Sequence, residues 1–109
     1  MSTTILIVDD EENARKNIGD FLSSKGYENC AVATLAEARE QVQHGNADII
    51  LLDVQLPDGY GPDLLGEIAH LPLRPPVIMI TGFGEIEMAV EAMKNGAHDF
   101  FQKPIEFLS

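Results

Sequence analysis

The chain has 109 residues, a length that fits one domain with its own hydrophobic core. Its 18 acidic and 7 basic side chains give a formal net charge of −11, which argues against direct binding of nucleic acid or of an anionic membrane. The single cysteine, Cys30, excludes an internal disulfide bond and a cysteine-rich zinc site, and we expect it to be a small buried residue of a strand. No signal peptide or spanning segment is evident, so we expect a cytoplasmic protein.

The first half of the chain alternates strand and helix patterns. An apolar run predicts a strand over residues 4–8, which acidic residues follow at once. Apolar residues at helical spacing then predict a helix that begins near Ala14 and is closed by Gly26. A weaker strand over residues 28–32 follows, and Thr34 is placed to cap a second helix that ends before Gly45.

The central strand is predicted over residues 47–53, where branched apolar residues stop at the carboxylate of Asp53. A turn at residues 57–59 leads to a third helix over about 62–70, and the proline-rich stretch 71–76 reads as a rigid connection. These patterns repeat the alternation of the first half.

The last third predicts a strand over residues 77–80 that ends at Thr81, a helix over 85–95 and a short strand over 99–102. Five strands that alternate with four helices indicate a doubly wound α/β fold with a parallel sheet in the order 2-1-3-4-5, as in flavodoxin. Only residues 105–109 remain after Lys103 and Pro104, so the fifth helix that would cover the last strand is largely missing.

Polar residues follow several of the predicted strands: Asp9 and Asp10, Asp53, Thr81 and Lys103. Because the carboxyl ends of parallel strands meet at one edge, we expect these five side chains to gather there. Each has an ordinary alternative, such as a helix cap for the aspartates, a turn hydroxyl for the threonine and a surface position for the lysine. A carboxylate directly behind a buried strand, however, needs a partner.

The residue types in this group suit phosphoryl transfer. Neighbouring carboxylates repel one another, and Mg²⁺ relieves this repulsion with a preference for carboxylate, carbonyl and water oxygens. Lys103 adds a second positive charge and Thr81 a hydroxyl donor. Asp53 is then the expected nucleophile, forming an aspartyl phosphate.

The ordered motifs at residues 7–11, 51–59, 80–82 and 103–104 resemble the receiver domain of two-component response regulators over essentially the whole chain. The stretch 81–97 resembles receivers of transcription activators, including the σ54-dependent class. The resemblance implies a CheY-like fold, a single receiver domain over residues 1–109 as the N-terminal part of a longer bacterial regulator, and a signalling switch rather than a turnover enzyme, although it promotes its own phosphorylation and slow dephosphorylation.

The resemblance also implies a role for each site residue. Asp53 matches the phosphoacceptor, which is charged by a sensor histidine kinase or phosphotransfer protein. Asp10 matches the direct ligand of Mg²⁺ or Mn²⁺, Asp9 the acid that acts through a metal-bound water, and Gln55 the residue whose backbone carbonyl completes the metal site. Thr81 matches the switch hydroxyl.

Further positions follow from the same resemblance. Lys103 matches the phosphate-binding lysine, with a cis peptide bond to Pro104 expected. Phe100 stands at the switch aromatic, although it equally suits the core. Gln55 and Phe83 are placed to flank the water that hydrolyses the phosphoryl group, with opposing effects on its lifetime.

Three other functions are weighed against a phosphorylated receiver. A haloacid-dehalogenase-type phosphatase needs a second aspartate where this chain has Gln55, and a flavodoxin-like cofactor binder needs a phosphate loop where this chain has acidic residues. A degenerate receiver that acts only as an interaction module is the third alternative. Less covered apolar surface beside Phe101, Ile105 and Phe107 makes a homodimer a further expectation.

Overall fold

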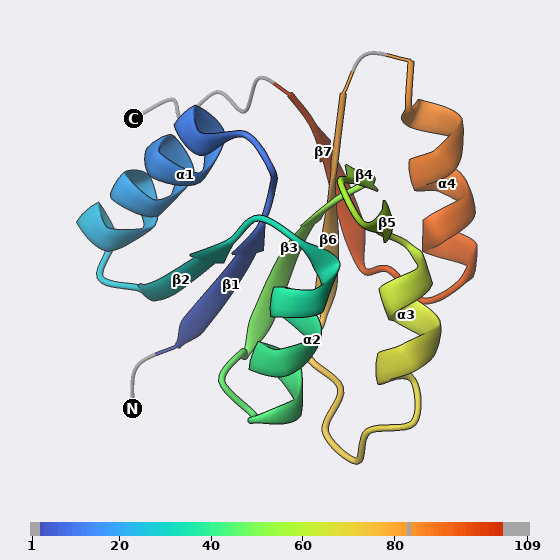
Figure 1. Ribbon diagram of the computed structural model, residues 1–109, viewed down its shortest axis with the longest axis horizontal. Coiled ribbons are helices and arrows are strands. Elements are labelled where there is room, and N and C mark those ends of the chain that lie inside the picture. Colours follow the sequence, from blue (N-terminus) through green and yellow to red (C-terminus); the bar gives the residue numbers. More distant parts are fainter. Residues whose placement is uncertain (1–2, 83, 104–109) are drawn as a thin grey trace.

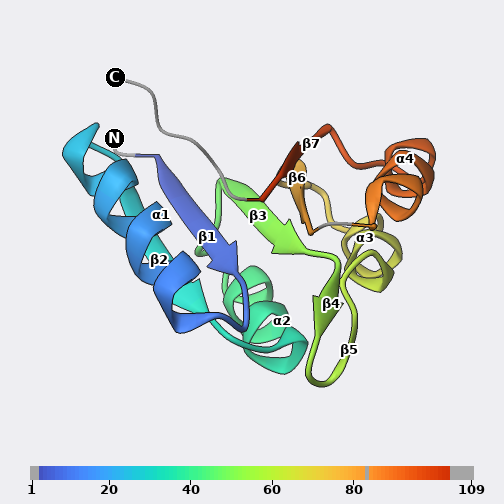
Figure 2. The same cartoon turned by 90° about the horizontal axis from the view of Figure 1, so that it is seen from above.

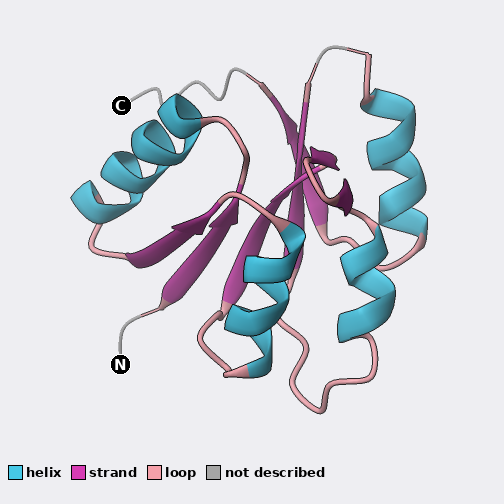
Figure 3. Ribbon diagram, in the orientation of Figure 1, coloured by secondary structure: helices cyan, strands magenta, loops and turns pink. Residues whose placement is uncertain are grey.

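The computed structural model describes residues 3–82 and 84–103 of the chain. One parallel sheet forms the centre, with strand order β2-β1-β3-β6-β7. It consists of β1 (Thr4–Val8), β2 (Glu28–Val32), β3 (Ile49–Asp53), β6 (Val77–Thr81) and β7 (Asp99–Gln102). Numbered by their order in this sheet alone, the strands run 2-1-3-4-5, and Figure 3 shows helices packed around them. The predicted doubly wound fold is confirmed.

The helices are α1 (Glu12–Ser24), α2 (Leu35–Gln43), α3 (Asp63–Ile68) and α4 (Ile86–Lys94). In Figure 1, α2 and α3 lie in front of the sheet, and the view from above in Figure 2 separates α1, beside β1 and β2, from α3 and α4 near β6 and β7. The third helix is shorter than predicted because a turn begins at Ala69. Across the described residues, no helix combines the length and hydrophobicity needed to cross a bilayer.

The start of α2 follows the predicted capping. Thr34 Oγ1 accepts a hydrogen bond from the backbone N–H of Glu37 at 3.2 Å, and it donates one to Glu37 Oε1 at 3.0 Å. This reciprocal arrangement satisfies one of the free N–H groups of the first turn.

A short hairpin follows the central strand, where the sequence predicted only a turn. Its strands are β4 (Gln55–Leu56) and β5 (Gly59–Tyr60), which pair antiparallel. Asp58 at its tip accepts hydrogen bonds from the backbone N–H groups of Leu35 at 2.8 Å and Ala36 at 3.0 Å. These bonds lower the pKa of the Asp58 carboxyl and fasten the hairpin to the first turn of α2.

Two apolar clusters cover the two faces of the sheet. The larger joins Leu6, Ile50, Leu52 and Met79 of the strands to α2, α3 and α4, and the smaller joins Ile7 and other strand residues to α1. Buried strand side chains on both faces are what a central parallel sheet requires, and they explain the continuous apolar runs of the sequence. Cys30 is only half-buried against the larger cluster, which corrects the expectation of a buried cysteine because β2 is an edge strand.

The sheet face beside α1 is less completely covered than the opposite face. A groove of about 470 Å³ is lined mainly by apolar side chains that include Phe21, Ile78 and Phe101. Phe101 is 48% exposed, in agreement with the expected less covered surface beside it. Ile105, Phe107 and the segment expected in place of a fifth helix lie outside the described residues.

Candidate functional site

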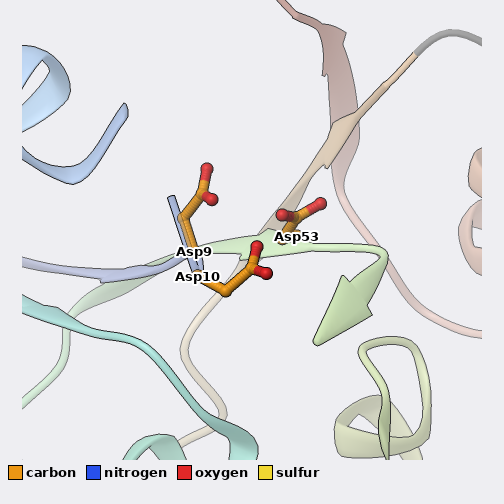
Figure 4. A group of neighbouring side chains, drawn as sticks. All are labelled: Asp9, Asp10 and Asp53. Carbon is orange, nitrogen blue, oxygen red and sulfur yellow. The ribbon is translucent and has the colours of Figure 1, made fainter. Parts of the chain in front are cut away.

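Three aspartates meet at the carboxyl edge of the sheet. One carboxylate oxygen from each of Asp9, Asp10 and Asp53 lies within 4.8 Å of the others. Asp9 and Asp10 follow β1, and Asp53 ends the neighbouring strand β3, so the parallel pairing of these strands brings them together. Figure 4 shows Asp10 and Asp53 pointing into the same space, with Asp9 on the β1 side. Asp9 and Asp53 are buried, whereas Asp10 is exposed.

Lys103 neutralises part of this buried charge. Its Nζ lies 2.9 Å from Asp9 Oδ2, 3.2 Å from Asp53 Oδ2 and 2.8 Å from Glu11 Oε1. Its backbone N–H donates to the carbonyl of Thr81 at 2.7 Å, which fixes the lysine beside the end of β6. Burial by itself lowers the pKa of the Lys103 ammonium, but the hydrogen bonds to Glu11 and Asp9 outweigh it, so the pKa is raised and the group stays charged.

One ammonium does not balance the carboxylates. Burial, and then the charge of Asp9, raise the pKa of the Asp53 carboxyl to about 7, against the opposing effect of Lys103. Asp9 Oδ1 accepts a hydrogen bond from the backbone N–H of Glu11 at 3.0 Å, but Asp9 Oδ2 is buried and has no hydrogen-bond partner beyond its ion pair with Lys103 among the described residues. The site therefore favours a further positive charge.

The oxygen ligands present fit Mg²⁺. Carboxylate oxygens are hard ligands that this ion prefers, and one oxygen from each of the three aspartates lies within 4.8 Å of the others. The exposed carboxylate of Asp10 leaves the group open to water, which completes the coordination of Mg²⁺ in proteins. Gln55 lines the same cleft as Asp10, Asp53 and Lys103, so its placement is compatible with a carbonyl ligand. Its side-chain amide points elsewhere, with Nε2 3.9 Å from the sulfur of Met88 on α4.

Comparison with known proteins gives the family. Residues 5–108 match the response regulator receiver domain. The chain belongs to this family. It is 42% identical over 107 residues to the transcriptional regulatory protein FixJ of Rhizobium meliloti, covering 94% of this chain and 50% of that protein. It is 38% identical over 101 residues to the response regulator protein PilR of Pseudomonas aeruginosa, covering 93% of this chain and 23% of that protein.

Solved structures agree with this assignment. The receiver domain of NtrX from Brucella abortus has a TM-score of 0.86 and 36% identity, with 94% of this chain and 87% of that chain covered. The resemblance to response regulator receivers is thus confirmed. This receiver spans half the length of FixJ and less than a quarter of PilR.

Thr81 and Phe100 lie where the sequence places them, at the end of β6 and in β7. Thr81 is fully buried, and its hydroxyl donates a hydrogen bond to the backbone carbonyl of Phe101 at 3.3 Å. Phe100 is half-buried and packs against the larger core cluster. In this structure the hydroxyl therefore joins β6 to β7. Phe83 and Pro104, with its expected cis peptide bond, lie outside the described residues.

Several residues that contribute to the receiver site were not predicted. Glu11 binds Lys103, Arg15 Nη1 donates to the carbonyl of Asp9 at 2.8 Å, and Glu85 lines the cleft. The sequence contains a run of acidic residues after β1, but nothing in that run indicates which of them binds Lys103.

Gly61 is the last unpredicted contributor. A Cβ atom at this position would lie 1.9 Å from the carbonyl oxygen of Asp53, so only glycine allows the chain to pass so close to the end of β3. Its N–H donates to the carbonyl of Val54 at 2.7 Å. The glycine-rich sequence from Asp58 to Gly61 was the available signal.

Proposed function

We propose that this receiver accepts a phosphoryl group on Asp53 from the phosphohistidine of a sensor histidine kinase or phosphotransfer protein, in a Mg²⁺-dependent reaction. One observation carries the proposal: the buried Asp53 carboxylate has Lys103 Nζ at 3.2 Å and oxygens of two further carboxylates within 4.8 Å. A nucleophile is thus combined with a cation and with a set of oxygen ligands that suits a metal ion.

The reaction uses the charges that the structure places around Asp53. A carboxylate oxygen of Asp53 forms a bond to phosphorus, the P–N bond of the donor breaks, and its electron pair returns to the histidine nitrogen. Lys103 stays protonated and offsets the negative charge of the transferring oxygens. When bound through Asp9, Asp10, Asp53 and the carbonyl of Gln55, Mg²⁺ supplies the additional positive charge that the phosphoryl oxygens and the carboxylates need.

The same phosphoryl group starts the switch. It adds about −1.5 to −2 charge and three acceptor oxygens at the ends of β3 and β6. The Thr81 hydroxyl, which bonds to the Phe101 carbonyl in this structure, is drawn toward the new acceptor and leaves β7. Phe100 then turns toward the space that Thr81 vacates, and the equilibrium of α4 and β7 shifts.

The expected output is transcription. FixJ and DctR are named transcriptional regulatory proteins, and the receiver covers only about half of each. We infer that this receiver is the N-terminal part of a bacterial cytoplasmic regulator whose output domain controls transcription, with the σ54-dependent class as the expected type. The receiver is a switch with slow hydrolysis of its own phosphoryl group rather than a turnover enzyme, and homodimerisation is part of the same proposal.

Intact-mass measurement after incubation with acetyl phosphate tests the proposal, with and without Mg²⁺. We expect a Mg²⁺-dependent gain of one phosphoryl group, which Asp53→Asn abolishes. No gain in the folded wild-type protein would refute phosphorylation and leave the interaction module as the better description. A gain that persists in Asp53→Asn would assign the phosphoryl group to another residue.

A further inference from the structure

A further carboxylate, that of Glu85, lies in the same cleft and has no part in the proposed chemistry. Glu85 Oε1 accepts a hydrogen bond from the backbone N–H of Gly82 at 2.6 Å. Gly82 and Glu85 both line the cleft that contains Asp53 and Lys103. Gly82 directly follows the end of β6, the strand that pairs with β3, so its N–H belongs to the edge of the sheet at which Asp53 lies.

This N–H is a donor that an incoming anion can use. Backbone N–H groups at a reaction site bind oxygens that carry negative charge, and they do so without reorganisation when they are already fixed. Here the donor is occupied by an anion of the chain itself, at the short distance of a charge-assisted hydrogen bond. Lys103 is engaged in a similar way by Glu11, at 2.8 Å.

We propose that Glu85 is a positioning residue that occupies the Gly82 N–H in the unphosphorylated receiver and yields it to a phosphoryl oxygen when Asp53 is phosphorylated. The inference rests on the proposed function. One N–H cannot serve both anions fully, and the carboxylate and the phosphoryl group repel each other within the cleft. Glu85 therefore stabilises the unphosphorylated form of the cleft and slows the phosphorylation of Asp53.

The position of Glu85 links this exchange to α4. Glu85 is the residue before the first residue of α4, and its carbonyl accepts the N–H of Ala89 at 3.1 Å. A side chain displaced from Gly82 is thus released at the N-terminus of the helix. The exchange carries the charge change at Asp53 to α4 independently of Thr81.

A purely local role is the alternative. The backbone N–H of Glu85 also donates to the carbonyl of Gly82 at 3.2 Å, so the two residues close a turn, and the side-chain bond then only shapes that turn. The two roles have different consequences. If the side-chain bond only shapes the turn, removing the Glu85 carboxylate changes the free energy of unfolding. If the Gly82 N–H is exchanged between Glu85 and the phosphoryl group, removing this carboxylate changes the rate of phosphorylation and the environment of the Gly82 amide.

The test compares four proteins: the wild type, Glu85→Gln, Glu85→Ala and Glu87→Gln. Glu87→Gln removes the same charge from an exposed position in the first turn of α4 that does not line the cleft. The maximal phosphorylation rate is measured from intact-mass time courses at saturating acetyl phosphate and Mg²⁺. We expect both Glu85 variants to be phosphorylated roughly three- to tenfold faster than the other two proteins. The reason is that the charged acceptor of the Gly82 N–H is replaced by a weaker acceptor in Glu85→Gln and by none in Glu85→Ala. Glu85→Gln keeps an oxygen acceptor for the turn, and urea unfolding checks that each variant is folded.

The amide proton of Gly82 gives the second measurement. In Glu85→Ala, its NMR resonance should lie upfield of the wild-type position and return downfield on phosphorylation. Equal maximal rates in all four phosphorylated proteins, or a Gly82 amide that does not respond to phosphorylation, would overturn the inference while leaving the proposed function intact. If neither the wild type nor any variant gains a phosphoryl group, the proposed function is refuted, and the inference is refuted with it.

Discussion

Asp53 shows how the burial of a single carboxylate lowers the stability of the fold. It is 5% exposed, next to the fully buried Asp9, and these two factors raise its pKa to about 7 despite Lys103. The ordinary pKa of an aspartate is about 4. At pH values between this ordinary pKa and the raised pKa, the group binds more protons in the folded state than in the unfolded state. Its ionisation on folding therefore opposes stability at and above neutral pH.

The metal-free receiver should accordingly lose stability as the pH rises from about 4 to above 7. Asp53→Asn removes this ionisation, so at pH 8 in the presence of a chelator the variant should be more stable than the wild type, by on the order of 2 kcal/mol. The difference should shrink as the pH falls toward about 4 and disappear below it, where the wild-type carboxyl is protonated in both the folded and the unfolded state. Urea unfolding at several pH values measures it.

Two observations would contradict this account. A stability difference between Asp53→Asn and the wild type that does not change with pH would show that the ionisation of Asp53 is not its source. Equal stabilisation of both proteins by Mg²⁺ would also count against it, because the ion should favour the wild type, which retains the complete carboxylate set.

The hairpin β4–β5 links Asp53 to the helix α2. It follows Asp53 directly, is tied to the first turn of α2 by Asp58, and returns the chain against the backbone of Asp53 at Gly61. The position of Asp53 thus depends on a loop whose own position is set by α2, which packs on one face of the sheet. A change in this loop should move the site even when no site residue is altered.

Gly61→Ala tests this dependence. The new Cβ would lie 1.9 Å from the Asp53 carbonyl oxygen and 3.1 Å from that of Val54, so the backbone must shift. We expect a loss of about 1–3 kcal/mol in urea unfolding and slower phosphorylation by acetyl phosphate. The matched control is Gly66→Ala in α3, where a Cβ meets no atom within 4 Å.

Gly66→Ala should leave phosphorylation unchanged and raise stability by about 0.5–1 kcal/mol, because alanine is the better helix former. If Gly61→Ala behaves like this control, the close approach to Asp53 does not matter for the site.

At the scale of the whole molecule, the proposed phosphorylation acts as a signal only if the charge change at one edge of the sheet alters a distant surface. Moving a two-state switch from 1% to 99% active requires about 5.5 kcal/mol of preference for the active state. The hydrogen bond from Thr81 to the Phe101 carbonyl, at 3.3 Å, joins the site to β7, and α4 packs against both β6 and β7. This strand pair and its helix are the region in which we expect the change.

Thr81→Ala should leave phosphorylation of Asp53 largely intact but weaken the response of α4 and β7. Backbone amide NMR spectra with and without acetyl phosphate measure this response as the size of the shift changes in the two elements. Thr81→Ser retains the hydroxyl and should restore most of the response. Shift changes in Thr81→Ala as large as those of the wild type would exclude the hydroxyl as the coupling group.

The strand–helix alternation and the sheet order were predictable because they depend on local patterns. Runs such as 49–52 identify buried strands by composition, and the rules of parallel connection leave few arrangements for five such strands. The hairpin after Asp53 was missed because two-residue strands are too short to show an alternating pattern. Asp-Gly at its turn was the remaining signal.

The sequence by itself determined that Asp9, Asp10, Asp53, Thr81 and Lys103 would share one edge, because each lies at or just after the end of a strand and parallel strands end on the same side. Only the tertiary structure decided how their side chains are paired. Lys103 reaches Glu11, 92 residues away, as well as Asp9 and Asp53, and Glu85 turns its carboxylate into the cleft to meet Gly82. Periodicity fixes where a strand ends, but side-chain direction depends on neighbours that are distant in the chain.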